Sequence, residues 1–293
     1  MIILFKAMRQ LDFMGVRYYA YAVSLLLLVI SLLSLGLKGL NLGLDFTGGT
    51  LLEVRYTPKQ STADIRKVLE RSGVSAFQVQ DTAQGTILVR LKVDEPRDKV
   101  LRALKTLGDY QLLRMESIGG VISGELRQKA LWAILTAIGG ILLYLAYRFE
   151  PVWALGAVLA LAHDVFLVVG AYSLTGREVN LDVVAALLVV AGYSISDTVV
   201  VFDRIRENMR IRKGTDLKTV INISINQTLS RTVMTSLTTF VVSLTMFLLG
   251  GPVLSNIMFS FVVGIVVGTL SSIFVASALV LDIKERLVRP KLA

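Results

Sequence analysis

One carboxylate in the sequence lies where a charge is costly. Asp197 follows an apolar run in "VVAGYSISDTVVVFDRIREN" (189–208), six positions before Asp203. A carboxylate in the hydrocarbon core of a membrane costs about 3 kcal/mol on insertion scales. On a helix, Tyr193 and Ser194 lie at i−4 and i−3, on the face of Asp197, where their hydroxyls can hydrogen-bond it. These residue types at this spacing indicate a proton-carrying carboxylate with a wet path beside it.

The natural counter-charge for this carboxylate is Arg231, in "SRTVMTSLTT" (230–239). Asp197 lies roughly 9 Å below Asp203 at 1.5 Å per residue, a depth that a snorkelling arginine can bridge. Thr235 and Thr239 follow Arg231 at i+4 and i+8, so their hydroxyls lie on the same face of the helix and can hold water between helices. We therefore expect Asp197 to carry the proton, Arg231 to gate it, and Thr235 to lie on the path.

A second charged pair, His163 and Asp164, lies near the middle of "LALAHDVFLVVGAYSL" (159–174). Intramembrane ionisable residues mark proton relays by default, so one interpretation is that this pair supports the relay. The other is structural, because a buried carboxylate can cap a neighbouring helix or donate a hydrogen bond when protonated. Both interpretations remain open from the sequence.

Long uncharged runs must position these groups. The chain has 293 residues, 54% hydrophobic, with a mean hydropathy of +0.66, which indicates an integral membrane protein. The uncharged runs cover 18–37, 130–147, 183–202 and 232–281, and the run 151–176 is broken only by His163 and Asp164. The fifty residues of 232–281 suffice for two spans of about 20 residues, with a turn in "LGGPVLS" (249–255). We predict a polytopic α-helical protein with six transmembrane helices.

Basic residues indicate the orientation of these spans. With the N terminus in the cytoplasm, fifteen Lys and Arg residues fall in inside segments and one, Arg177, in the short outside loops. Both termini are therefore predicted to be cytoplasmic, and the first span is an uncleaved anchor rather than a signal peptide. The net charge of +9 fits contact with membrane lipids, whereas no aromatic residues are interleaved as a nucleic acid groove requires. We expect no nucleic acid partner.

Residues 38–129, between the first two spans, collect most of the chain's polar residues and predict a folded extracytoplasmic domain. Strand patterns at 50–57, 76–82, 86–93 and 110–118 alternate with helix patterns at 62–73 and 96–108. The order βαββαβ is that of an α+β ferredoxin-like domain. The domain has no histidine, no cysteine and no carboxylates at metal-ligand spacing, which favours a binding or lever module over an enzyme. We expect no cofactor and no metal.

The predicted organisation has three parts: an N terminus and first span (1–37), the extracytoplasmic domain (38–129), and a bundle of five spans (130–293) with a cytoplasmic loop (203–230). Gly48-Gly49 and Gly119-Gly120 flank the domain and are either hinges or ordinary turns. The loop suggests an amphipathic stretch on the cytoplasmic face. Small residues recur every fourth position in the sixth span, where Gly264 and Gly268 predict close helix packing.

Four segments of the chain together resemble one family. They are "GLDFTGGT" (43–50), "LAHDVFLVVG" (161–170), "AGYSISDTVVVFDRIREN" (191–208) and "NQTLSRTVMTSLTT" (226–239). They resemble the SecF branch of the SecD/SecF protein-export family, whose fold is shared with the wider resistance-nodulation-division transporters. The resemblance covers the whole chain, and the segment around Asp197 is its most specific part.

The resemblance implies a subunit of the bacterial inner membrane that uses the proton gradient to promote export of unfolded polypeptides. The implied partners are SecD, the SecYEG channel, the exported polypeptide and YajC. Asp197 and Arg231 match the family's proton-pathway pair, and Thr235 a neighbouring polar position. The tail of the motif fixes the cytoplasmic end of its helix with Asp203, Arg204, Arg206 and Glu207. Sodium in place of the proton is compatible with the same carboxylate.

Three other functions compete with this one. An intramembrane aspartyl protease would use Asp164 and Asp197, but the local sequences His-Asp and Ile-Ser-Asp differ from the motifs of those enzymes. Half of a proton-driven small-molecule efflux pump is a second alternative, although a single loop of about ninety residues leaves little room for a drug pocket. A passive assembly subunit of a membrane complex is the third.

Overall fold

The computed structural model describes residues 11–74, 77–82, 85–93 and 95–288. The chain divides into two compact units: an insert domain, Leu42–Trp132, and a helix bundle, Met1–Asn41 with Ala133–Ala293. Within the described residues, six helices are long and apolar enough to cross a membrane. The predicted fold class, six spans with a small α/β domain after the first, is confirmed. The basic residues Lys6, Arg9, Arg289 and Lys291, and residue 76 of one predicted strand, lie outside the described ranges.

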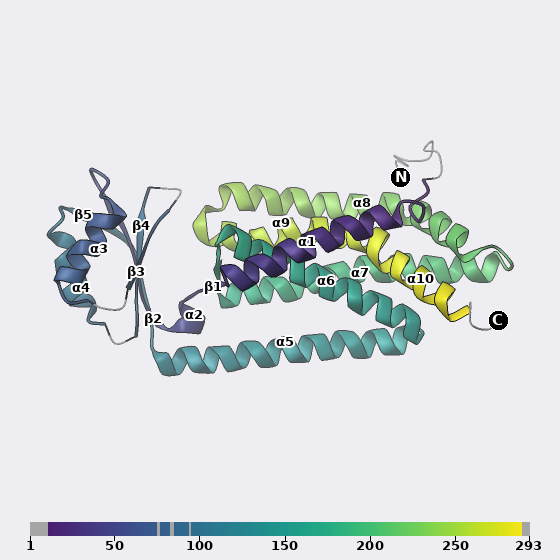
Figure 1. The fold of residues 1–293 in the computed structure, drawn as a ribbon, viewed down its shortest axis with the longest axis horizontal. Helices are drawn as coiled ribbons and strands as arrows, with labels where there is room; N and C mark the ends of the chain where they lie inside the picture. Colours follow the sequence, from purple (N-terminus) through teal and green to yellow (C-terminus); the bar gives the residue numbers. More distant parts are fainter. Residues whose placement is uncertain (1–10, 75–76, 83–84, 94, 289–293) are drawn as a thin grey trace. The chain divides into compact units, whose positions relative to one another are not determined.

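The insert domain has the predicted βαββαβ order. Its elements are β2 (Gly49–Tyr56), α3 (Thr62–Arg71), β3 (Phe77–Asp81), β4 (Ile87–Leu91), α4 (Arg97–Lys105) and β5 (Tyr110–Ile118) (Figure 1). The four strands form an antiparallel sheet in the order β3-β4-β2-β5. Alternating residues of the sheet and the apolar faces of both helices form one core, which includes Leu52, Val54, Ile65, Leu69, Val89, Val100 and Leu104.

The Gly48-Gly49 pair at the start of this domain is tightly packed. It follows a short helix that the sequence did not predict, α2 (Leu44–Thr47). Both glycines have positive φ, +66° and +113°. A Cβ on Gly49 would overlap the carbonyl oxygen of Leu91, and one on Gly48 would lie 2.9 Å from Val93 Cγ2. The pair therefore forms a fixed turn against β4 and its following residues, which speaks against a loose hinge at this point.

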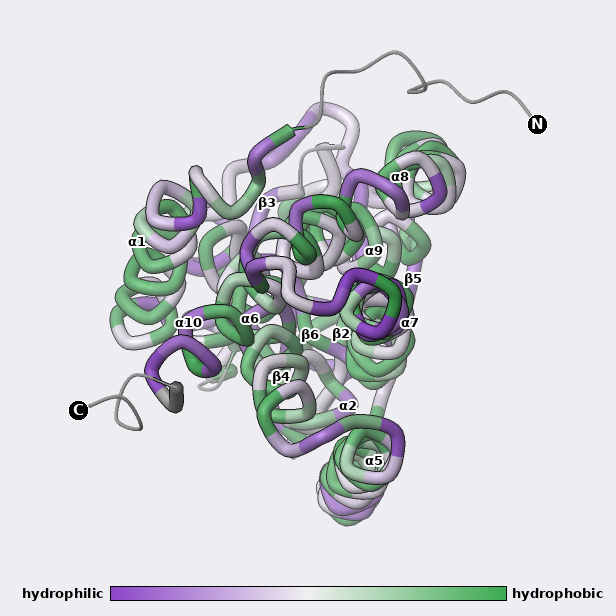
Figure 2. Tube along the Cα trace, turned by 90° about the vertical axis from the view of Figure 1, so that its right-hand side faces the viewer, coloured by the Kyte–Doolittle hydropathy of each residue, from purple (hydrophilic) through white to green (hydrophobic). Residues whose placement is uncertain are grey.

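The helix bundle is built from α1 (Arg17–Leu37), α5 (Gly120–Arg148), α6 (Pro151–Thr175), α7 (Leu181–Ile211), α8 (Leu217–Leu249), α9 (Gly251–Ser271) and α10 (Ser277–Val288) (Figure 1). Two-residue strands, β1 (Asn41–Leu42) and β6 (Glu178–Val179), pair with each other. The helices are mostly hydrophobic along their length (Figure 2). Side chains such as Leu143, Tyr147 and Leu249 are more than 70% exposed in the chain alone. Lipid or partner helices must cover such side chains in a membrane.

Two helix boundaries differ from the prediction. Helix α5 begins at Gly120, ten residues before the predicted span, because "GELRQK" is too charged for a hydropathy signal yet rich in good helix formers. The segment 203–230 is not a loop lying on the surface. Instead α7 continues to Ile211 and α8 starts at Leu217, since the buried Ile205, Asn208 and Ile221 continue the bundle core into this segment.

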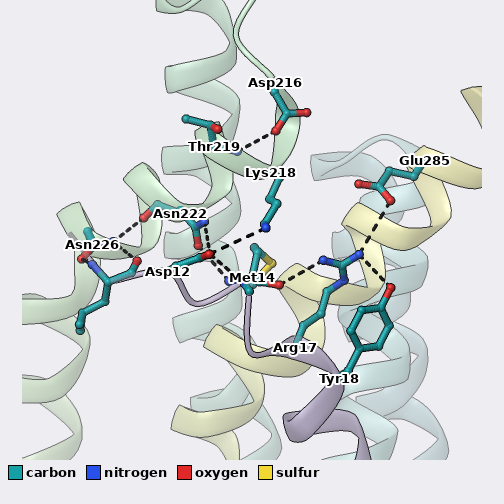
Figure 3. A network of polar contacts seen from close by, with 12 residues as sticks. Asp12, Met14, Arg17, Tyr18, Asp216, Lys218, Thr219, Asn222, Asn226 and Glu285 are labelled. Carbon is teal, nitrogen blue, oxygen red and sulfur yellow. Dashed lines mark hydrogen bonds and ion pairs between the residues drawn. The ribbon is translucent and has the colours of Figure 1, made fainter.

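The segment before α1 is held against the first turns of α8 (Figure 3). Asn222 Oδ1 accepts a hydrogen bond from the Met14 N–H at 2.9 Å, and Asn222 Nδ2 donates to Asp12 at 2.7 Å. Asn226 forms a two-way pair with the backbone N–H and carbonyl of Leu11. Arg17 continues the network to α10 through Asp282 at 3.1 Å. Two asparagines one turn apart thus fasten the start of the chain to α8.

The last span contains a wide turn. A π-helical segment, Ser272–Ala276, joins α9 to α10 without a break. Ser277 Oγ donates to the Ser272 carbonyl, five residues earlier, at 3.0 Å. π-helical turns of this kind are rare and occur frequently at functional sites.

Candidate functional site

Asp197 of α7 is buried and only 8% exposed. Ser236 of α8 donates a long hydrogen bond, 3.4 Å, to Asp197 Oδ2. The same Ser236 hydroxyl receives a hydrogen bond from Tyr193 Oη at 3.2 Å and lies 2.7 Å from Thr269 Oγ1, which also contacts the Ile265 carbonyl of its own helix at 2.6 Å. Hydroxyls from α7, α8 and α9 therefore converge beside one carboxylate. The sequence argument expected Tyr193 to hydrogen-bond Asp197 itself, whereas it donates to Ser236, and neither Ser236 nor Thr269 was predicted.

Arg231 and Thr235 are both exposed on α8 in the chain alone. Arg231 forms no ion pair with Asp197 in the described part of the chain. Thr235 Oγ1 donates to the carbonyls of Arg231 and Thr232 on its own helix. The hydroxyl that reaches Asp197 comes instead from the next residue, Ser236. One residue is a rotation of about 100° on a helix, too fine a difference for the spacing argument.

Asp164 is 1% exposed and belongs to a second cluster. Ser194 Oγ donates to Asp164 Oδ2 at 2.5 Å, and His163 Nδ1 lies 2.8 Å from Asp164 Oδ1. Ser194 was expected to hydrogen-bond Asp197 on its own helix. The structure corrects this, because α6 brings Asp164 against α7 and the Ser194 hydroxyl donates across that interface.

Four polar atoms in the bundle are buried without a hydrogen-bond partner among the described residues: His163 Nε2, Asn180 Oδ1, Thr232 Oγ1 and Ser271 Oγ. Thr232 precedes Ser236 by one turn of α8, and Ser271 follows Thr269 by two residues on α9. Buried polar atoms of this kind are generally satisfied by internal water. The two carboxylates therefore lie in the polar part of an otherwise apolar bundle.

The residues of the motif that follows Asp197 tie the ends of three helices together. Asp203 pairs with Arg148 at the end of α5 at 2.7 Å, and Arg206 donates to the Arg148 carbonyl at 3.1 Å. Arg204 pairs with Glu207 at 2.6 Å and donates to Gln227 of α8 at 2.7 Å. These contacts fix the end of α7 and hence the depth of the carboxylate six residues before it.

Two glycines of α9 allow close approach to α7. A Cβ on Gly264 would overlap the Val190 side chain, and one on Gly268 would lie 3.0 Å from Ser194 Cβ. Gly268 thus packs on the serine that holds Asp164, and its neighbour Thr269 contacts the serine that holds Asp197. Among the described residues, His, Asp and Glu side chains form no group of three that could hold a metal ion.

Comparison with known sequences identifies the family of this bundle. Residues 98–286 match the family described as "Protein export membrane protein SecD/SecF, C-terminal". The chain belongs to the SecD/SecF family. Residues 33–60 also match the "SecD/SecF GG Motif", and this range contains the packed Gly48-Gly49 turn.

Relatives with the SecF name match over nearly their full length. The chain is 41% identical to the protein translocase subunit SecF of Calditerrivibrio nitroreducens, covering 96% of this chain and 97% of the relative. It is 38% identical to SecF of Escherichia coli O157:H7, covering 96% and 91%. The chain is therefore a multi-pass membrane protein of a translocase-subunit family, not an enzyme.

A solved structure of a SecD/SecF family member has the same fold. The crystal structure of SecDF from Thermus thermophilus, described as a translocon-associated membrane protein, matches 98% of this chain with a TM-score of 0.88 and 41% identity. This chain spans about 40% of the length of that fused protein. In that relative, SecD and SecF are parts of one polypeptide.

Proposed function

We propose that this chain is the SecF half of a SecD–SecF unit in the bacterial inner membrane. The unit uses the proton gradient to promote the passage of unfolded polypeptides through the SecYEG channel, with YajC as a further partner. The fused SecDF relative supports association with SecD, because one polypeptide there contains both halves. Both termini lie in the cytoplasm, and the insert domain lies on the far side of the membrane.

The buried Asp197 carboxylate is the observation that carries this proposal. A carboxylate that is 8% exposed, in a helix long enough to span the membrane, is energetically costly, which indicates that it has a function there. Tyr193, Ser236 and Thr269 form a hydroxyl cluster that can pass a proton to it. Asp197 carries the proton, and the hydroxyl cluster forms its path.

Arg231 and Thr235 act from the exposed side of α8. Their exposure in the chain alone leaves them available to a second subunit. A carboxylate that exchanges a proton as a guanidinium approaches can couple proton passage to helix movement. SecD completes the site on this side, and Arg231 moves toward Asp197 when the two halves shift.

The test is export into membrane vesicles that contain SecD, SecYEG and this chain, with and without a proton gradient. In Asp197→Asn, export with the gradient should fall to the level without it. Asp182→Asn makes the same change in the exposed first turn of α7 and should keep the gradient dependence. Copurification of SecD with both variants shows whether the complex is intact. If Asp197→Asn retains gradient-stimulated export, the carboxylate is not the proton carrier and a passive assembly role is favoured.

A further inference from the structure

The His163–Asp164 pair has the geometry of a proton acceptor in its own right. Asp164 Oδ2 accepts a hydrogen bond from Ser194, and Asp164 Oδ1 lies 2.8 Å from His163 Nδ1. We assign the tautomer in which Nδ1 donates to the carboxylate, which leaves the lone pair of the imidazole on Nε2. Nε2 is buried and has no hydrogen-bond partner among the described residues. The imidazole thus presents one basic nitrogen to the polar interior of the bundle.

We propose that His163 and Asp164 form a second proton-binding site, coupled to Asp197 through Ser194 and α9. When Nε2 takes a proton from a hydronium ion, which reverts to water, the neutral imidazole becomes an imidazolium held by the Asp164 carboxylate. The net charge of the pair then changes from −1 to 0, and no other group of the protein gains or loses a proton. This site deepens the proposed function, since it rests on Asp197 being the proton carrier of the bundle.

Few other titratable groups face this pair. α6 packs against α1, α7, α9, α10 and the π turn, and neither α9 nor the π turn has a titratable side chain. α7 contributes Tyr193 and Asp197. The charged groups of α1 and α10 are Arg17, Asp282, Lys284, Glu285 and Arg286. Arg17 pairs with Asp282, which also accepts from Tyr21, and Lys284 pairs with Glu150 at the start of α6. Glu150 is thirteen residues before His163, about 20 Å along the helix.

Ser194 and Gly268-Thr269 connect the two carboxylates. Ser194 lies one turn before Asp197 on α7 and donates to Asp164. A Cβ on Gly268 would lie 3.1 Å from Ser194 Oγ, so α9 packs closely on this serine. Thr269 Oγ1 lies 2.7 Å from the hydroxyl of Ser236, the serine that holds Asp197, and 2.6 Å from the Ile265 carbonyl of α9. A change of the Ser194–Asp164 hydrogen bond is therefore transmitted by α9 to the hydroxyl cluster.

The chain offers a direct probe, because His163 is the one histidine among its 293 residues. Histidine labelled with ¹⁵N, in full-length protein carrying a tag without histidine and held in lipid nanodiscs, gives a single imidazole spectrum. We expect a hydrogen-bonded Nδ1–H, and a second N–H on Nε2 that appears as the pH is lowered from about 9 to about 4. A spectrum that stays unchanged across this range would overturn the site.

Variants separate the pair from its coupling. Asp164→Asn should change the midpoint, the pH at which the imidazole spectrum changes, because the substitution removes the neighbouring carboxylate, and Ser194→Ala should have a smaller effect. Ser243→Ala is the matched control, because that buried hydroxyl donates to its own helix at the Thr239 carbonyl. An unchanged midpoint in both Asp164→Asn and Ser194→Ala would refute the pairing, even if one variant folds poorly.

The coupling predicts that Asp197→Asn also moves the His163 midpoint and that Thr269→Val reduces this effect. Thr238→Val, whose hydroxyl is exposed and donates to its own helix, should leave the effect intact. An identical midpoint with and without Asp197→Asn would refute the coupling. These measurements involve no export, so they can fail while the gradient dependence of export stands, and the reverse.

Discussion

Replacing Gly49 by alanine should destabilise the insert domain more than any other single methyl group added to its backbone. At φ +113° an L-residue is strained by about 1–3 kcal/mol. The added Cβ would also overlap Leu91 O, a backbone atom of the strand whose residue Leu91 pairs with Thr50. Moving β4 away costs a further 1–3 kcal/mol, roughly, as in overpacked cores. The expected loss is about 4 kcal/mol, a large part of the stability of a small domain.

Hydrogen exchange of the full-length protein measures this loss locally. Amides of β2 and β4 that exchange through opening of the domain should exchange about a thousandfold faster in Gly49→Ala, since each 1.4 kcal/mol is a factor of ten. Gly119→Ala is the matched control, because a Cβ there meets no atom within 4 Å. If Gly49→Ala exchanges at the rate of the unchanged protein, the turn is a flexible hinge and the packing argument is wrong.

Two further predictions concern the helix bundle. Gly264→Ala should lower the stability of the bundle by about 1–3 kcal/mol, because the new methyl would overlap the stiff, β-branched Val190. Thermal unfolding in detergent measures this loss. The control Gly140→Ala, whose Cβ would have no atom within 4 Å, should show no loss. The Asn222 amide, the Gly15 N–H and the charge of Lys218 hold the pKa of Asp12 below its usual value. Asp12 therefore stabilises the segment before α1 above about pH 4, and this stabilisation is lost as the pH falls through the lowered pKa. For so exposed a group the contribution is below about 1 kcal/mol. Exchange of the Leu11 and Met14 amides should therefore gain extra pH dependence that Asp12→Asn removes, and the same pH dependence in that variant would show that Asp12 is not its cause.

The strongest periodicities predicted the fold. Runs of about twenty apolar residues predicted the spans, and the alternation around Leu52 and Val89 predicted strands of the insert domain. The prediction was wrong where charge hid a helix, as at the start of α5, and where a charged stretch was taken for a surface loop. Residues 203–211 continue α7 because Ile205 is buried in the bundle, a fact of packing that hydropathy averages do not contain.

At the candidate site, too, the sequence did not reveal which elements pack together. Sequence spacing predicted which residues share a face of α7, and Tyr193 and Asp197 do reach the same hydroxyl. It could not tell which helix lies opposite, so Ser194 was assigned to the wrong carboxylate. Thr269 carried no signal at all, because one hydroxyl in an apolar helix resembles any other until its neighbour is known.

The π turn in the last span separates two rotational phases of one helix. One extra residue in a turn rotates everything after it by about 100°. Before the turn, Gly264 and Gly268 face α7. After it, Val280 comes within 2.6 Å of the position that a Cβ on Gly156 of α6 would occupy. A deletion of one residue between Ser272 and Ala276 would bring both halves into a single phase and turn Asp282 away from Arg17. In an alignment, that one extra residue marks the point where the helix changes from packing against α7 to packing against α6.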